Sequence, residues 1–200
     1  MASAIILAGG RGTRYQKQKQ FELLNGIEMW KHVYQKVIRV VAQDNVVVVG
    51  VDIEGGKTRS ESVQRGLNYL KKDCKRVVVL EAARPLVTVE QIEKLINDGN
   101  MSTTFALPLV NTVIGRDGTY FNREDFYDLL TPQAFDYRLL KQAYDTGKYI
   151  DTTDETIIMY KEYGIKPHFI LEGENLLKVT YKRDMEVIKQ MLENEDGERI

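Results

Sequence analysis

Glycine and cationic side chains gather near the start of the chain, in a pattern that could bind an anion. Residues 5–14 read Ile-Ile-Leu-Ala-Gly-Gly-Arg-Gly-Thr-Arg, and Lys17 and Lys19 follow shortly afterwards. Small residues let a backbone come close to a ligand, and glycine tolerates positive φ, so that backbone N–H groups can point at an anion. Arg14 and a following lysine add fixed positive charge. The segment therefore predicts a buried strand that ends in a polyphosphate-binding loop.

Two common phosphate-binding motifs do not fit these glycines. The dinucleotide fingerprint needs G-x-G-x-x-G, and Tyr15 stands where its third glycine should be. A Walker A loop ending in residues 56–58 (Gly-Lys-Thr) would need a further glycine at the position of Val51. A glycine turn that only links a strand to a helix is the structural alternative, but such a turn gains nothing from the clustered cations.

Composition predicts one cytoplasmic globular domain over residues 1–192, followed by a charged, disordered tail over residues 193–200. The chain has 200 residues, is 43% hydrophobic, and carries 28 Lys and Arg against 29 Asp and Glu. This balance gives no reason to expect nucleic acid or a membrane surface as a partner. The single Cys74 excludes an intramolecular disulfide, and the sequence has no run of 18 apolar residues.

Apolar runs and segments with helical periodicity alternate along the chain. Strands are expected at Ser3–Leu7, Asn45–Val51, Arg76–Leu80, Thr103–Leu107 and Pro167–Leu171, each apolar enough to be buried on both faces. Helices are expected at Glu28–Val41, Ser60–Lys72, Val89–Asp98, Asp136–Thr146, Asp154–Tyr163 and Arg183–Leu192. The alternation predicts an α/β three-layer sandwich around a mainly parallel sheet, which binds ligands at the carboxyl ends of its strands. Residues 111–122 interrupt it as a short projecting β-arm.

Three further positions could carry chemistry, and each has an ordinary structural alternative. Glu81 directly follows a buried strand, where it could hold a metal or be a surface acid near Arg84. Ser62, near the start of a helix, could contact a ligand or only cap the helix. Lys178 lies in an alternating segment typical of a half-buried strand, and could be a surface lysine. Residues 130–135 are expected to be extended, because Pro132 keeps the preceding residue out of the α region.

Taken in chain order, these pieces resemble the cytidylyltransferase family that includes 2-C-methyl-D-erythritol 4-phosphate cytidylyltransferase and ribitol-5-phosphate cytidylyltransferase. The matching motifs are Leu7–Arg14 with Lys19-Gln20, Gly55–Val63, Ala82–Pro85, Asn111-Thr112, Thr131–Phe135, Thr153–Glu155 and Lys178–Thr180. The resemblance spans Ile5 to about Leu192. It implies a nucleotide-diphospho-sugar transferase-like, Rossmann-like fold, CTP and a polyol phosphate as substrates, Mg²⁺ as cofactor, and often a homodimer joined through the arm.

The resemblance also implies a role for each matched residue. The nucleotide would be bound by Leu7, Ala8, Gly9, Gly10, Gly12, Gly56, Ser62 and Glu81, with Ala8, Gly9, Gly56 and Ser62 around the cytosine. Arg14 and Lys19 would contact the triphosphate and Lys178 the α-phosphate, as the catalytic cations. Glu81 would also hold the metal. Arg84, Thr112 and Arg123 would bind the acceptor phosphate, with Arg123 supplied by the same subunit or by its partner.

The sequence departs from the family pattern at several of these places. Leu80-Glu81 replaces the family's His-Asp, Leu176 replaces an asparagine, and the arm is short. Gln18 replaces a proline in a short loop, so that Lys17 is an alternative to Lys19. The start Leu7–Gly10 leans slightly toward ribitol 5-phosphate as acceptor. Two other functions stay open, which are a sugar-phosphate nucleotidyltransferase that uses another nucleotide and a non-catalytic nucleotide-binding relative.

Overall fold

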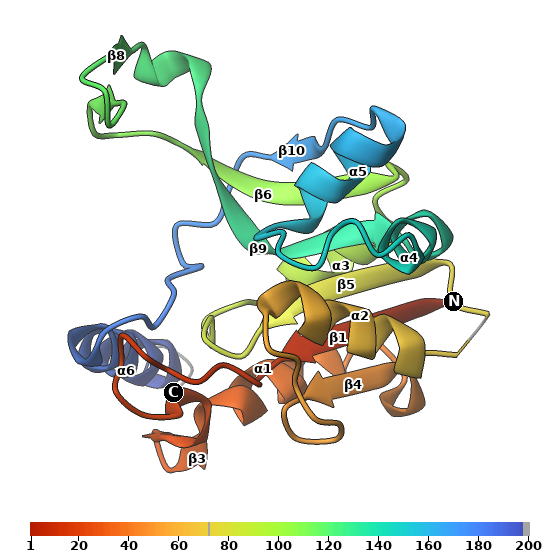
Figure 1. The fold of residues 1–200 in the computed structure, drawn as a ribbon. Helices are drawn as coiled ribbons and strands as arrows, with labels where there is room; N and C mark the ends of the chain where they lie inside the picture. Colours follow the sequence, from red (N-terminus) through yellow and green to blue (C-terminus); the bar gives the residue numbers. More distant parts are fainter. Residues whose placement is uncertain (72, 198–200) are drawn as a thin grey trace.

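The fold is built around a six-stranded sheet in a computed structural model that describes residues 1–71 and 73–197 (Figure 1). The strand order is β10-β6-β9-β5-β1-β4. These strands comprise β1 (Ala2–Leu7), β4 (Val46–Val49), β5 (Arg76–Glu81), β6 (Ser102–Pro108), β9 (Tyr127–Asp136) and β10 (His168–Ile170). β1 lies between β4 and β5 and is parallel to both, so that Leu7, Val49 and Glu81 end at the same edge of the sheet.

Strand β9 is the main difference from the expected topology. The sequence predicts residues 130–135 only as an extended segment, whereas the structure places them inside the sheet, antiparallel to both β5 and β6. Proline cannot donate to a ladder, so that in sheets it is found at edges or irregular positions. The register of β9 against β6 shifts between Gln133 and Leu130, so that Thr131 and Pro132 fall at the irregularity, where proline is tolerated. The sheet is therefore mixed, although mostly parallel.

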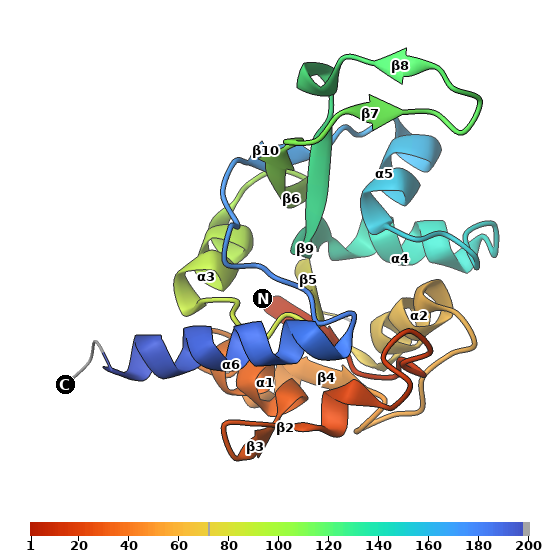
Figure 2. The same ribbon diagram turned by 90° about the vertical axis from the view of Figure 1, so that its left-hand side faces the viewer.

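Helices cover both faces of the sheet, because its inner strands are apolar on both sides. On one face, α1 (Met29–Val37) and α3 (Val89–Asn97) pack with Ile6, Val48 and Phe105. On the other face lie α2 (Arg59–Tyr69), α4 (Tyr137–Asp145) and α5 (Glu155–Tyr163), in one cluster with Ile5 and Val79. Figure 2 shows the two helix layers on opposite sides of the sheet. The predicted three-layer α/β class is thus confirmed. Edge strand β10 differs from the prediction, since His168 and Phe169 are exposed.

Helix α6 (Lys182–Gly197) closes the carboxyl edge of the sheet (Figure 2). Its Met185, Ile188 and Leu192 are buried in a third apolar cluster with Tyr15 and Val179. The helix includes residues 193–197, which the sequence assigned to a disordered tail. Helix propagation past the buried Leu192 costs little, because glutamate is a good helix former. Residues 198–200 lie outside the described chain.

Irregular segments and two small hairpins complete the fold. Residues 171–181 run without strand structure, so the half-buried strand predicted around Lys178 is wrong. The buried residues Leu176 and Val179 are three positions apart and lie in two different apolar clusters, so that burial does not alternate here. Val179 N donates to the carbonyl of Ala83, in the loop after β5, at 2.8 Å. A small hairpin, β2 (Leu23–Leu24) with β3 (Ile27–Glu28), precedes α1. Short 3-10 turns occupy Lys19–Phe21 and Gln43–Asn45.

The predicted arm is present and projects from the body of the molecule (Figures 1 and 2). It consists of β7 (Val113–Ile114) paired with β8 (Tyr120–Phe121), followed by a 3-10 turn at Arg123–Asp125. Within residues 1–71 and 73–197, no helix is both long enough and apolar enough to cross a lipid bilayer.

Candidate active site

A cavity of about 320 Å³ opens at the carboxyl ends of β1 and β5, where the sequence placed the ligand. Its walls are the glycine-rich loop after β1, the start of α2, the loop after β5 and the segment around Lys178. All the residues predicted to bind the nucleotide or to act as catalytic cations line this cavity. They are Leu7, Ala8, Gly9, Gly10, Gly12, Arg14, Lys19, Gly56, Ser62, Glu81 and Lys178.

The glycine-rich loop is held in a conformation that only glycine accommodates at its turning point. Gly12 has φ of 62°, and a Cβ placed on it would lie 1.7 Å from the carbonyl oxygen of Lys17. The turn closes through Gln16 N, which donates to the carbonyl of Gly12 at 2.6 Å. Buried Gln20 donates from Nε2 to the carbonyl of Gly10 at 3.1 Å. These contacts keep the loop folded at the mouth of the cavity.

Lys19, and not Lys17, belongs to the cavity. The 3-10 turn that begins at Lys19 directs its Nζ to the carbonyl oxygen of Val179, across the cavity wall. The side chain of Lys17 is 64% exposed and lies 3.5 Å from Glu22, outside the cavity lining. Burial and the neighbouring cation Lys178 lower the pKa of Lys19. Because burial and Lys178 disfavour the charged form of Lys19, an anionic ligand in the cavity would stabilise that form.

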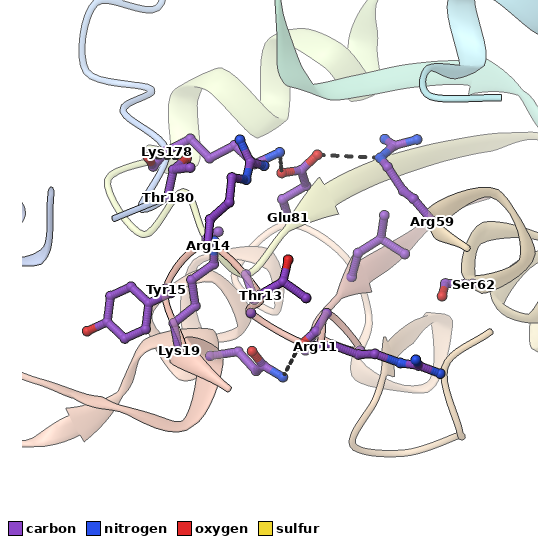
Figure 3. A pocket seen from close by; sticks show the side chains of 18 of the residues that line it. Arg11, Thr13, Arg14, Tyr15, Lys19, Arg59, Ser62, Glu81, Lys178 and Thr180 are labelled. Carbon is purple, nitrogen blue, oxygen red and sulfur yellow. Dashed lines mark hydrogen bonds and ion pairs between the residues drawn. The ribbon is translucent and has the colours of Figure 1, made fainter. Parts of the chain in front are cut away.

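Glu81 lies between two cations at the end of β5. Lys178 Nζ forms an ion pair with Glu81 Oε2, and Arg59 Nε lies 3.4 Å from Glu81 Oε1. Figure 3 shows the two cations reaching the carboxylate from opposite sides. Burial would raise the pKa of Glu81, but Lys178 and Arg59 outweigh burial and hold that pKa below its ordinary value. The carboxylate is therefore ionised at neutral pH, and the predicted alternative of an ordinary surface acid does not hold.

Ser62 contacts the loop before α2 and does not cap the helix. The N-cap is Thr58, whose Oγ1 accepts a hydrogen bond from Glu61 N at 3.1 Å. Ser62 Oγ donates to the carbonyl of Thr58 at 3.0 Å and accepts from Gly56 N at 2.9 Å. Ser62 thus fixes Gly56 on the wall of the cavity, which leaves the ligand-contact interpretation in place and contradicts the capping one.

The three predicted acceptor residues do not line the cavity. Arg84 lies just behind it, where Nε donates to Thr131 Oγ1 at 2.8 Å and Nη1 donates to the carbonyl of Leu176. Thr112 is exposed at the base of the arm, and Arg123 donates to the carbonyl of Val110 on the arm itself. Within one chain, only Arg84 of the three is therefore close to the cavity.

The cavity also contains residues for which the sequence analysis proposed no role. These are Arg11, Thr13, Tyr15, Gln20, Lys57, Thr58, Arg59, Ala82, Ala83 and Thr180. Arg59 is the most informative of them. It is the first residue of α2 and directly follows the loop that carries Gly56. Its closeness in sequence to Gly56 was the signal that could have placed it at the cavity.

The fold and the cation-lined cavity at the carboxyl edge of the sheet together define a nucleotidyltransferase of the nucleotide-diphospho-sugar transferase-like class. Residues 2–194 match the family model described as IspD, 2-C-methyl-D-erythritol 4-phosphate cytidylyltransferase. The chain belongs to this family.

Individual relatives agree with this assignment. The 2-C-methyl-D-erythritol 4-phosphate cytidylyltransferase of Thermotoga neapolitana is 33% identical, over 94% of this chain and 96% of the relative. The Haemophilus influenzae enzyme of the same name is 29% identical, over 91% and 92% of the two chains. Among solved structures, the bifunctional IspDF of Campylobacter jejuni superposes with a TM-score of 0.80 at 29% identity, over 92% of this chain. This chain spans 53% of that bifunctional protein.

A second solved structure shows the fold over almost the full length of both chains. The 4-diphosphocytidyl-2C-methyl-D-erythritol synthase of Anaerococcus prevotii superposes with a TM-score of 0.81, over 96% of each chain and at 22% identity. This solved structure therefore has the expected fold class over nearly the whole length of both chains.

Proposed function

We propose that this protein transfers CMP from CTP to 2-C-methyl-D-erythritol 4-phosphate and releases pyrophosphate. The observation that carries the proposal is the cavity in which Arg14, Lys19 and Lys178 face a glycine-rich loop and an ionised carboxylate. The names of the relatives favour the methylerythritol acceptor over ribitol 5-phosphate, toward which residues 7–10 leaned.

The chain's own residues supply charge and orientation for the reaction. A phosphate oxygen of the acceptor attacks the α-phosphorus in line, the bond to the bridging oxygen breaks, and pyrophosphate leaves with its electron pair. A phosphate monoester is already a nucleophile near neutral pH, so that fixed cations matter more than a general base. Arg14 and Lys19 would neutralise the triphosphate, and Lys178 the charge that gathers on the α-phosphate. Each such cation contributes on the order of 3 kcal/mol to the transition state.

Base recognition would fall to the opposite wall of the cavity. Ala8, Gly9 and Gly56 present backbone groups there, and the hydroxyl of Ser62 lies next to Gly56. Leu7, Gly10 and Gly12 would complete the nucleotide site, with the two glycines cradling the phosphates. Glycine has no Cβ, so that the edge of cytosine with its exocyclic amino group could come close to the backbone there. Hydrogen bonds from the backbone would then recognise the base.

The donors in the cavity fit Mg²⁺. Mg²⁺ prefers oxygen ligands and is commonly held by one or two carboxylates together with substrate phosphates. Glu81 supplies one ionised carboxylate, and within residues 1–71 and 73–197 no cluster of three or more potential metal-binding side chains competes with it. Glu81 would hold the metal beside the nucleotide ribose. Bound there, Mg²⁺ would draw charge from the phosphates toward the leaving group.

The pH above which CTP binding weakens, its alkaline limit, should be set by the lowered pKa of Lys19. CTP binds the protonated amine, so affinity should fall tenfold per pH unit once the pH exceeds the pKa of Lys19 in the free enzyme. Because burial and Lys178 lower that pKa, the fall should begin below the usual range for lysine. Calorimetric titration with CTP between pH 7 and pH 11 measures it.

Two variants test the origin of that limit. Lys178→Ala removes a neighbouring positive charge and should move the limit to higher pH. Lys17→Ala, which changes an exposed lysine outside the cavity, should leave it where it is. A limit that does not respond to Lys178→Ala would contradict the assignment to Lys19.

A partner subunit would complete the acceptor site through the arm. Tyr120 is 74% exposed and Ile114 is 52% exposed on the arm, and burying such side chains against a second copy would be favourable. In this dimer Arg123 of one subunit, with Thr112, would bind the acceptor phosphate held by Arg84 of the other.

Loss of Arg123 should therefore weaken acceptor binding and leave the nucleotide unaffected. Arg123→Ala should raise the KM for the acceptor about tenfold or more, because a charged hydrogen bond is worth about 1.5–3 kcal/mol, with the KM for CTP unchanged. Arg116→Ala, another exposed arginine of the arm, is the matched control. Sedimentation of the wild-type protein gives the oligomeric state, and a monomer at assay concentrations would contradict the shared site.

Pyrophosphate release tests the proposed function directly. CTP and Mg²⁺ are incubated with 2-C-methyl-D-erythritol 4-phosphate, ribitol 5-phosphate or glycerol 3-phosphate, each in a separate assay. Release with the first acceptor alone is expected. Release with ribitol 5-phosphate instead would reassign the acceptor. Stronger thermal stabilisation by UTP, ATP or GTP than by CTP would contradict CTP as the substrate. Stabilisation by CTP without any turnover would point to a non-catalytic relative.

A further inference from the structure

Arg59 connects the cavity to a buried polar network that the proposed reaction does not use. Its Nη1 donates to Glu155 Oε1 at 2.6 Å, and Glu155 is fully buried at the first turn of α5. Tyr144 OH donates to the same Glu155 oxygen at 3.0 Å. Ser60 Oγ, which donates to the carbonyl of Tyr149, lies 3.1 Å from Tyr144 OH. The network thus joins α2, α4 and α5 behind the cavity wall.

The guanidinium of Arg59 serves two carboxylates at once. Its Nε faces Glu81 in the cavity, while its Nη1 faces buried Glu155. Burial would lower the pKa of Arg59, but Glu155 and Glu81 outweigh burial and raise it. A buried carboxylate needs a partner charge, so that Arg59 cannot turn away from Glu155 without leaving it uncompensated. The fixed fork of arginine can hold both groups, whereas the single ammonium of a lysine cannot.

The two cations that hold Glu81 therefore differ in how freely they can leave it. The side chain of Lys178 is 35% exposed, and within the described part of the chain Glu81 is the one carboxylate with which it forms an ion pair. It can therefore turn to a phosphate that enters the cavity. Arg59 is anchored from behind. If Lys178 were the only ion-pair partner of Glu81, its departure would leave a nearly buried carboxylate with no cation in direct contact and only the weaker influence of Arg84.

We propose that Arg59, anchored by Glu155, is a positioning residue that keeps the Glu81 carboxylate in place when Lys178 moves from Glu81 to the α-phosphate. This inference rests on the proposed function. It assigns Arg59 and Glu155 a part in the reaction, although Glu155 lies outside the cavity lining. Arg59 acts through Glu81, and through Glu81 on the metal that Glu81 would hold.

The test compares Arg59→Lys and Glu155→Gln with the wild-type protein. Arg59→Lys keeps the charge but can reach only one of the two carboxylates. We would measure the melting temperature, kcat, and CTP affinity by calorimetry in EDTA. A fourth measurement is the half-saturating Mg²⁺ concentration, at which Mg²⁺ gives half of its maximal thermal stabilisation in the presence of CTP. Arg65→Gln is the control, because Arg65 lies on the same helix, is half exposed and pairs with exposed Glu54.

Arg59→Lys should leave CTP affinity in EDTA within threefold of wild type. The half-saturating Mg²⁺ concentration should rise about tenfold, and kcat should fall 10–100-fold, the usual effect of losing a group that orients a metal ligand. Glu155→Gln should change both in the same direction, and it carries the test if Arg59→Lys fails to fold. Arg65→Gln should change neither.

Three results would overturn the positioning role. Unchanged Mg²⁺ dependence and kcat in both variants would show that Glu81 does not need Arg59. A loss of CTP affinity in EDTA as large as the loss of kcat would show that Arg59 contacts the nucleotide directly. Equal effects of Arg65→Gln would indicate a general effect on α2. Wild-type protein that neither binds CTP nor releases pyrophosphate would contradict the proposed function, and this inference with it.

Discussion

Replacing Lys178 with alanine should lower kcat by 10²–10³-fold, which corresponds to the loss of one preorganised charge at the α-phosphate. CTP affinity should fall far less, because Arg14 and Lys19 still bind the triphosphate. The fold should persist, because the Lys178 side chain is one-third exposed and Glu81 keeps its contact with Arg59. Steady-state pyrophosphate release and calorimetry with CTP separate the two effects.

Lys182→Ala is the matched control for this variant. Lys182 begins α6 just after the same segment, is exposed, and does not line the cavity. Its replacement should leave both kcat and CTP affinity unchanged. Turnover of Lys178→Ala at the wild-type rate would refute the mechanism, because Lys178 would then have no part in stabilising the transition state.

Replacing Gly12 with alanine should abolish most nucleotide binding. Alanine at φ of 62° is strained by about 1–2 kcal/mol, and its Cβ would overlap the carbonyl oxygen of Lys17, so that the loop must take another course. Its N–H groups would then miss the phosphates, and CTP affinity should fall on the order of a hundredfold. The melting temperature should drop by only a few degrees, because the strain is confined to a loop at the surface of the sheet.

Gly99→Ala separates the loop from a general effect of replacing glycine. Gly99 has no positive φ, and a Cβ placed on it meets nothing within 4 Å. This variant should bind CTP and melt like the wild-type protein. CTP affinity retained by Gly12→Ala would show that the phosphates bind elsewhere than on this loop.

Most of the fold was predictable because β1, β4 and β5 are short runs of mainly apolar residues, and because β6, although it begins with Ser102, Thr103 and Thr104, continues into Phe105-Ala106-Leu107. The runs that became β1, β4, β5 and β6 have no competing helical period, and the helices between them carry clear apolar faces. For β9 the sequence indicated only an extended segment around Pro132. Its place between β5 and β6, and the register shift that accommodates proline, are tertiary features. The segment around Lys178 failed for the opposite reason. Its residue types alternate as in a strand, but the buried residues Leu176 and Val179 are three positions apart in an irregular segment.

The cavity was predictable as far as motifs mark it. The glycine-rich loop, Glu81 and Lys178 each lie in a short pattern that the chain topology brings to one edge of the sheet. The choice between Lys17 and Lys19 needed coordinates, because both follow the loop and only the turn at Lys19 directs its side chain inward. Arg59 was missed because its importance comes from contacts with Glu81 and Glu155, which lie 22 and 96 residues away.

The packing of α6 has a consequence for the order in which this protein becomes functional. Tyr15 in the glycine-rich loop and Val179 beside Lys178 are buried against the same helix, and the Lys19 ammonium meets the Val179 carbonyl 160 residues further along the chain. A nascent chain leaves the ribosome amino end first and can pair β1 with β4 and β5 while α6 is still being made. The contact between Lys19 and Val179 therefore forms only after residues 179–192 have been made and α6 has packed against Tyr15 and Val179.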